Sequence, residues 1–103
     1  MTDAVIVLIT APEEEASRIQ ELLVKERLAA CVNSLPAESF YSWKGKHERA
    51  GETLLILKTR KSALERIEKR IKEIHPYDVP EILAVPIVWG SKDCLEWLDK
   101  EVS

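Results

Sequence analysis

Residues 75–81 carry the side chains best suited to binding chemistry in this sequence. The segment reads His-Pro-Tyr-Asp-Val-Pro-Glu and follows a helical pattern that ends near Ile74. Pro76 cannot continue a helix and moves His75 out of the helical conformation, while Pro80 stiffens the far end. An imidazole, a phenol and two carboxylates are thereby held on a short, rigid connection, where binding groups often lie. The alternative interpretation is only a helix end followed by a strand start.

The composition narrows the class of protein. With 103 residues the chain is long enough for one hydrophobic core and too short for two, so residues 1–103 are expected to form a single domain. The formal net charge of −3 disfavours nucleic acid and anionic membranes as partners, because both require a basic surface. No apolar run is long enough to span a membrane, and residues 1–10 lack signal-peptide features, so a cytoplasmic location is expected.

The two cysteines give little sign of chemistry. Cys31 and Cys94 are far apart in sequence, with no CxxC pair and no cluster of histidines beside them. In a reducing compartment a disulfide is not expected. We therefore expect two free thiols that act as small buried apolar side chains.

Apolar patterns indicate the elements that position the 75–81 segment. The expected strands are 4–10, 30–43, 54–59 and 82–88, and the expected helices are 13–27, 62–74 and 91–102. Pro36 interrupts the second strand, and a proline there implies an edge position or a bulge, so two strand pieces with a bend are expected. Ser62 and Glu65 match a capping box that begins the second helix.

The order β-α-β-β-α-β with a terminal helix predicts an α+β, ferredoxin-like sandwich. Right-handed crossovers place both long helices on one face of the sheet. The terminal helix can shield part of the other face, but three helical turns cannot cover all of it. Self-association is the physical remedy for the remainder.

The expected hairpin strengthens the case for self-association. Phe40, Tyr41 and Trp43 lie within four residues, on a strand that leads out to the turn at 44–46. Strand alternation sends Tyr41 and Trp43 to one face and Phe40 to the other, so both faces of the hairpin require burial. A closed homo-oligomer whose hairpin crosses onto a neighbour is therefore expected. In the alternative, the aromatic side chains fold back onto their own domain.

Taken with this element order, six segments resemble those of the CutA family of divalent-cation tolerance proteins. They cover nearly the whole chain: Thr10–Pro12, Leu28–Asn33, Tyr41–Lys46, Leu57–Arg60, His75–Glu81 and Leu95–Trp97. The resemblance implies a ferredoxin-like fold and a compact homotrimer resembling those of the P-II signalling proteins. It supplies the number three, which residue spacing alone cannot.

The resemblance also implies a link to copper and other divalent cations. Some family members have a proposed copper site built from a cysteine one residue before the Thr-Ala-Pro turn and two adjacent histidines before Pro-Tyr. Here those positions hold Ile9 and Ile74, which leaves His75 as the candidate ligand for Cu(II) or another divalent cation. One imidazole is a poor site unless carboxylates such as Asp78 or Glu81, or another subunit, complete it. The alternative is a hydrogen-bonded structural histidine.

A second candidate site involves Lys58, which ends an otherwise apolar strand pattern. Its ammonium group is expected either at the rim of the sheet or paired with an acid such as Glu81. By similarity to P-II-like trimers, a ligand cleft between subunits is then expected from Lys58, Tyr77, Glu81 and a neighbouring copy's Trp43.

Two classes of function remain open. The first is a non-catalytic homotrimer that acts in divalent-cation tolerance and responds to metal ions. The alternative is a P-II-like small-molecule sensor or protein-interaction trimer with a ligand cleft between subunits. An enzyme is not expected, because no Ser-His-Asp or Cys-His grouping, glycine-rich phosphate loop or paired-carboxylate cleft is evident.

Overall fold

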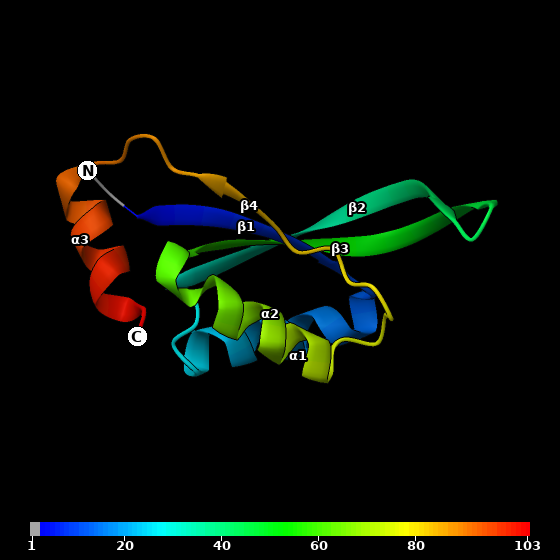
Figure 1. The fold of residues 1–103 in the computed structure, drawn as a ribbon, viewed down its shortest axis with the longest axis horizontal. Coiled ribbons are helices and arrows are strands. Elements are labelled where there is room, and N and C mark those ends of the chain that lie inside the picture. The colour runs from blue at the N-terminus through cyan, green and yellow to red at the C-terminus, as the bar shows by residue number, and fades with distance from the viewer. Residues whose placement is uncertain (1–2) are drawn as a thin grey trace.

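The computed structural model describes residues 3–103 and has the predicted element order (Figure 1). The strands are β1 (Ala4–Ala11), β2 (Cys31–Trp43), β3 (Lys46–Arg60) and β4 (Leu83–Pro86). The helices are α1 (Glu13–Lys25), α2 (Leu64–Ile74) and α3 (Lys92–Glu101), and a 3-10 turn, η1 (Lys61–Ala63), precedes α2. This arrangement confirms the prediction of a ferredoxin-like α+β fold.

One face of the sheet is covered by helices. The strand order is β2-β3-β1-β4, with every neighbouring pair antiparallel, and both α1 and α2 lie against the same face (Figure 1). Alternate residues of β1 and β3 point into this helix layer and are fully buried, including Val7, Ile9, Leu55 and Leu57. Because the two central strands supply these residues, the core lies between them and the helices.

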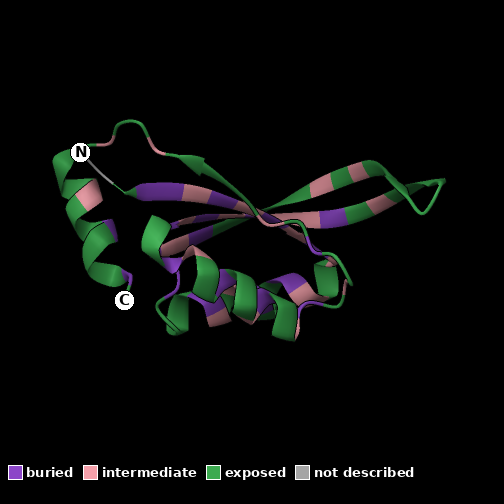
Figure 2. Cartoon of the chain, viewed as in Figure 1, coloured by how far each residue is buried: buried purple, intermediate pink, exposed green. Residues whose placement is uncertain are grey.

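On the opposite face, which we call the open face, the described residues 3–103 place no helix, and most of its side chains are apolar. Its cross-strand pairs follow from the register, since Leu8 lies opposite both Ile56 and Leu83. The apolar members of the open face are Ile6, Leu8, Leu35, Leu54, Ile56, Leu83 and Val85. Leu83 is 58% exposed and Val85 46% exposed. Figure 2 shows β4 as an exposed strand.

Helix α3 lies at one end of the sheet, away from the hairpin (Figure 1). Leu98 of this helix and Val102, which directly follows it, are buried in the same core as residues of α1 and α2. Ser91 caps the helix by accepting a hydrogen bond from the Cys94 N–H at 3.3 Å. At the other end, the Ser103 N–H donates to the Arg27 carbonyl at 3.0 Å. This position leaves the apolar rows of the open face uncovered.

Strands β2 and β3 form a long hairpin that extends well beyond the helices (Figure 1). The turn between them has positive φ at Lys44 (51°) and Gly45 (79°), the combination that suits a two-residue hairpin. Strand β2 is continuous through Pro36, so the prediction of two pieces is wrong. The reason is its position at the sheet edge, where a missing N–H can face away from the ladder.

Other local predictions also failed. Ser62 lies inside η1 and makes no capping hydrogen bond, so the capping box is absent. Strand β4 is shorter than predicted and ends at Pro86, which pairs with Val5. The Ile87 N–H still donates to the carbonyl of Ala4, the first residue of β1, and β1 offers no partner beyond that point. Cys31 is half-buried and Cys94 is exposed, so their predicted burial is wrong.

The turn geometry predicts a contrast between two glycines. An alanine at Gly45 must adopt a left-handed backbone, so G45A should destabilise the fold by about 1 kcal/mol. Gly51 lies in β3 without positive φ and with open space around its Cα, so G51A should be neutral or slightly stabilising. Denaturant unfolding of both variants measures the difference. Equal effects would contradict this account of the turn.

Candidate functional site

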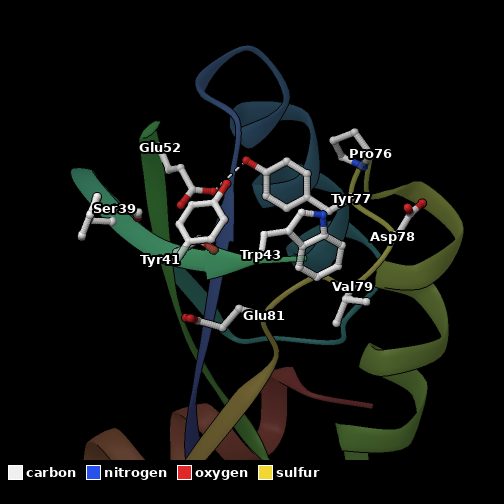
Figure 3. Close-up of a pocket in the computed structure, with 11 residues that line it drawn as sticks. Ser39, Tyr41, Trp43, Glu52, Pro76, Tyr77, Asp78, Val79 and Glu81 are labelled. Carbon is white, nitrogen blue, oxygen red and sulfur yellow. Dashed lines mark hydrogen bonds between the residues drawn. The ribbon is translucent and has the colours of Figure 1, made fainter. Parts of the chain in front are cut away.

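A cavity of about 660 Å³ lies between the hairpin and the 75–81 segment, and we call it the hairpin pocket. Its walls combine aromatic rings with carboxylates, as Figure 3 shows. The principal lining residues are Tyr41, Trp43, Glu52, Tyr77, Asp78 and Glu81. They come from β2, β3 and the connection between α2 and β4, so distant parts of the sequence meet here.

His75 anchors the 75–81 segment to the central sheet. Its Nε2 lies 2.8 Å from the carbonyl oxygen of Thr10, at the end of β1, and its Nδ1 accepts a hydrogen bond from the Tyr77 N–H at 3.1 Å. These partners assign the proton to Nε2, which donates to Thr10. The imidazole is buried and its ring lies against that of Tyr77, with centroids 4.8 Å apart. The histidine therefore fixes where the segment leaves α2.

Tyr77 joins the segment to β3. Its hydroxyl donates to Oε2 of Glu52 at 2.7 Å, and Glu52 is only 7% exposed. Burial, the hydrogen bond to Glu52 and the negative charge of Glu52 all raise the pKa of the Tyr77 hydroxyl above its ordinary value. The Tyr77 hydroxyl therefore keeps its proton and donates a hydrogen bond to the Glu52 carboxylate. Without this bond the carboxylate would be buried without a partner.

The structure brings three of the four predicted cleft residues together within one chain. Trp43, Tyr77 and Glu81 all line the hairpin pocket. Lys58 does not line it. Its ammonium group donates to Oδ1 of Asn33, and its register partner Ile6 places it on the open face. Lys58 is thus paired with neither Glu81 nor another acid of its own chain among residues 3–103.

The hairpin aromatics divide between two faces, as strand alternation predicts. Tyr41 and Trp43 face the pocket (Figure 3). Phe40 also borders it, and its ring centroid lies 4.7 Å from the guanidinium carbon of its cross-strand partner Arg49. Phe40 is 61% exposed, the largest exposed fraction of the three. The hairpin therefore leaves apolar surface in contact with solvent in a single chain.

His75 offers no free lone pair to a metal ion in this conformation. Nδ1 accepts from a backbone N–H and Nε2 carries the proton that faces Thr10. Within residues 3–103, no three side chains of His, Cys, Asp or Glu are grouped closely enough to hold a metal ion. Metal ligation by His75 would require one ring nitrogen to leave its partner, either Nδ1 the Tyr77 N–H or Nε2 the Thr10 carbonyl.

Glu52 is the site residue that sequence reasoning missed. In the sequence it appears to belong to a polar stretch before the apolar run of β3, and nothing marks it as buried. Its partner Tyr77 is 25 positions away. The one sign of a buried acid in the sequence is a single carboxylate placed directly beside the apolar run of β3.

Among residues 3–103, the structure has no helix with the length and apolar character needed to cross a membrane.

The raised pKa of Tyr77 predicts a delayed ionisation at alkaline pH. An ordinary tyrosine ionises near pH 10, and the folded protein holds this proton more tightly than the unfolded chain does. Its contribution to stability is therefore complete below pH 10 and is lost as the pH rises towards the higher pKa of the folded state. Ultraviolet titration should show a phenol that ionises late, and Y77F should remove that transition.

Y41F is the matched control, because it removes the other tyrosine and should leave the late transition in place. A late transition that survives in Y77F would contradict the assignment. Y77F also leaves the Glu52 carboxylate without its donor, so chemical unfolding at neutral pH should show a loss of about 1–3 kcal/mol.

Comparisons with known proteins give the family. The family of the CutA1 divalent ion tolerance protein matches residues 5–101. A divalent-cation tolerance protein CutA from Thermus thermophilus is 48% identical over 95 residues, which span 90% of this chain and 92% of the relative. The chloroplastic protein CutA of Arabidopsis thaliana is 46% identical and matches 92% of this chain, which spans 53% of the plant protein.

Solved structures agree with this result. The divalent cation tolerance protein (Cut A1) from Thermus thermophilus superposes with a TM-score of 0.94 at 45% identity, over 97% of this chain and 99% of that chain. The periplasmic divalent cation tolerance protein CutA from Archaeoglobus fulgidus has a TM-score of 0.93 at 42% identity, with the same coverage. Sequence and fold together show that this chain belongs to the CutA family of divalent-cation tolerance proteins.

Proposed function

We propose that this chain acts in divalent-cation tolerance as a non-catalytic homotrimer. The role is supported by the names of its relatives, which are divalent-cation tolerance proteins from bacteria and archaea. The assembly is supported by the open face, which is the observation that carries the proposal. An apolar sheet face of this extent is normally buried against another layer, and residues 3–103 provide none.

Both edges of the sheet support the same conclusion. The strand order leaves β2 and β4 with a neighbour on one side only. Unpaired edge strands are templates for another chain, and β2 is a 13-residue strand without a break. The exposed Phe40 adds apolar surface at the hairpin. A closed ring of copies covers such surfaces without leaving new edges. The resemblance to the CutA family, with its P-II-like homotrimers, supports a ring of three copies.

The proposed link to Cu(II) or another divalent cation does not use His75 as it lies in the single chain. Its ring nitrogens are occupied by Thr10 and Tyr77. The exposed residues Asp78 and Glu81 follow it on the same connection and are the candidate oxygen donors. Assembly would bring further donors from neighbouring copies, so the trimer is the form in which cation binding is best measured.

The chemistry of the hairpin pocket argues against a catalytic role. Its buried carboxylate, Glu52, already accepts a hydrogen bond from the Tyr77 hydroxyl, and His75 is hydrogen-bonded to backbone groups. Neither pair is arranged as a base beside a free nucleophile. A cytoplasmic location stays a prediction, since the relatives include chloroplastic and periplasmic proteins.

Growth in copper tests the proposed function. A bacterial strain that lacks its own CutA protein should grow poorly in elevated Cu(II), and expression of this chain should restore growth. If a variant that cannot assemble fails to restore growth, cation tolerance depends on the homotrimer. Failure of the wild-type chain to restore growth, at an expression level verified by immunoblot, would contradict the cation-tolerance role.

Two exposed valines provide a matched test of assembly. Val85 lies on the open face and Val24 on α1, with exposed fractions of 46% and 40%. V85E places a charge in the proposed interface, so sedimentation velocity at micromolar concentration should show monomers. V24E should remain trimeric. A trimer that persists in V85E, or a wild-type chain that sediments as a monomer, would contradict the proposed interface.

The contacts of His75 predict the effect of H75Q on copper binding. Because both ring nitrogens are occupied, titration calorimetry should give the same Cu(II) stoichiometry for H75Q as for the wild type, although the variant should be less stable. Zn(II) serves as the comparison cation. Loss of stoichiometric Cu(II) binding in a trimeric, folded H75Q would establish His75 as a ligand instead.

The hairpin pocket favours a second candidate function, that of a small-molecule sensor. A cavity of about 660 Å³ lies within the range of known ligand sites, and its polar and aromatic groups converge on one space. Cation tolerance would then be an indirect result of signalling.

A further inference from the structure

We infer that the hairpin pocket binds a small organic cation, one that carries an ammonium or guanidinium group on an apolar or aromatic body. This inference rests on the second candidate function, the small-molecule sensor, and specifies the class of ligand. It is carried by the combination of aromatic walls and carboxylates in one cavity.

The aromatic walls are the first step of the argument. The sequence has six Phe, Trp and Tyr residues, and four of them line this pocket: Phe40, Tyr41, Trp43 and Tyr77. Figure 3 labels the last three. Ring faces attract cations through their negative quadrupole, with Trp the strongest. The indole of Trp43 already has the Lys44 ammonium nitrogen 5.6 Å from its ring centroid. The pocket thus offers the surface on which quaternary and protonated amines are recognised.

The charge of the lining is the second step. Within the described part of the chain, the charged side chains that line the pocket are all carboxylates, from Glu52, Asp78 and Glu81. In Figure 3 the Glu52 carboxylate lies beside the ring of Tyr41, whereas Asp78 points outward. An anionic ligand would be repelled, and a neutral ligand would gain nothing from these charges. The lining therefore discriminates in favour of a cation.

Size separates an organic cation from a bare metal ion. A cavity of about 660 Å³ holds a molecule of a dozen or more heavy atoms. Its three carboxylates are not grouped closely enough to form a metal site within residues 3–103. Aromatic surface lies between the carboxylates. The complementary ligand therefore carries its positive charge and an apolar body in one molecule.

The Tyr77–Glu52 pair forms a fixed part of the pocket lining. Both groups are satisfied by their mutual hydrogen bond, and Glu52 is almost completely buried. Glu81, by contrast, is exposed and makes no side-chain hydrogen bond or ion pair with another of residues 3–103. Its carboxylate is therefore the one available to a ligand's cationic head. Glu81 and Trp43 are therefore the two residues on which binding should depend most.

Three probes of matched shape test the class of ligand. Titration calorimetry on the assembled wild-type protein compares 2-phenylethylammonium, 2-phenylethanol and phenylacetate at neutral pH. We expect the ammonium probe to bind at least tenfold more tightly than the alcohol, and the carboxylate probe not to bind. If the alcohol or the carboxylate binds as tightly as the ammonium, the cationic class is wrong although the pocket still takes small molecules.

Variants locate the binding. W43L should weaken the ammonium probe about tenfold and E81Q about fivefold. E96Q, which removes an exposed carboxylate from α3, should leave binding unchanged, and circular dichroism and sedimentation check fold and assembly. Ammonium binding that is equal in W43L, E81Q and wild type lies elsewhere and overturns the inference. If none of the probes binds at millimolar concentration, both the inference and the sensor function fail, while the copper-growth result stands separately.

Discussion

Helices cover only one face of this sheet, and the remaining features of the molecule follow from that constraint. Residues of β1 and β3 alternate between a fully buried row and the open face, so each central strand contributes to two surfaces at once. Burying a single Leu or Ile side chain contributes roughly 1.5–3 kcal/mol, and the buried row supplies the stability of the isolated chain. The other row is also largely apolar and gains that stabilisation from contact with a further layer. A second copy of the same chain can provide that layer, so no additional segment is needed.

The hairpin pocket depends on the same two central strands. Its wall is held by His75 at the end of β1 and by Tyr77 against β3, through three hydrogen bonds of 2.7 to 3.1 Å. Pro76 and the buried Pro80 limit the conformations that the segment can adopt between them. The imidazole thus has a structural role that suits its neutral form. A rigid wall facing a long hairpin creates the cavity, and the aromatic side chains of the hairpin give it its character.

The sequence predicts the order of elements and the covered face because periodicity reports which side chains are buried. It does not predict Pro36 within an unbroken β2, since an edge strand tolerates a missing N–H that a central strand would not. The capping box fails because a 3-10 turn occupies the residues that would have formed it. The 75–81 segment is recognisable as a candidate site, yet its partner Glu52 is not, because the two lie on different elements, 25 positions apart in the sequence at the Tyr77–Glu52 contact. Lys58 shows the same limit, with a partner, Asn33, that lies on the neighbouring strand.

The hydrogen bond between Ser103 and Arg27 has a practical consequence. Arg66 also donates to the Ser103 carbonyl, so the last described residue is held beside the ends of α1 and α2. Figure 1 shows this point at one end of a molecule whose long axis measures 45 Å, with the hairpin at the other end. A tether attached after Ser103 therefore starts on the helix side, remote from the aromatic cavity. Immobilising the protein on a sensor chip through that point leaves the pocket facing the flowing solution.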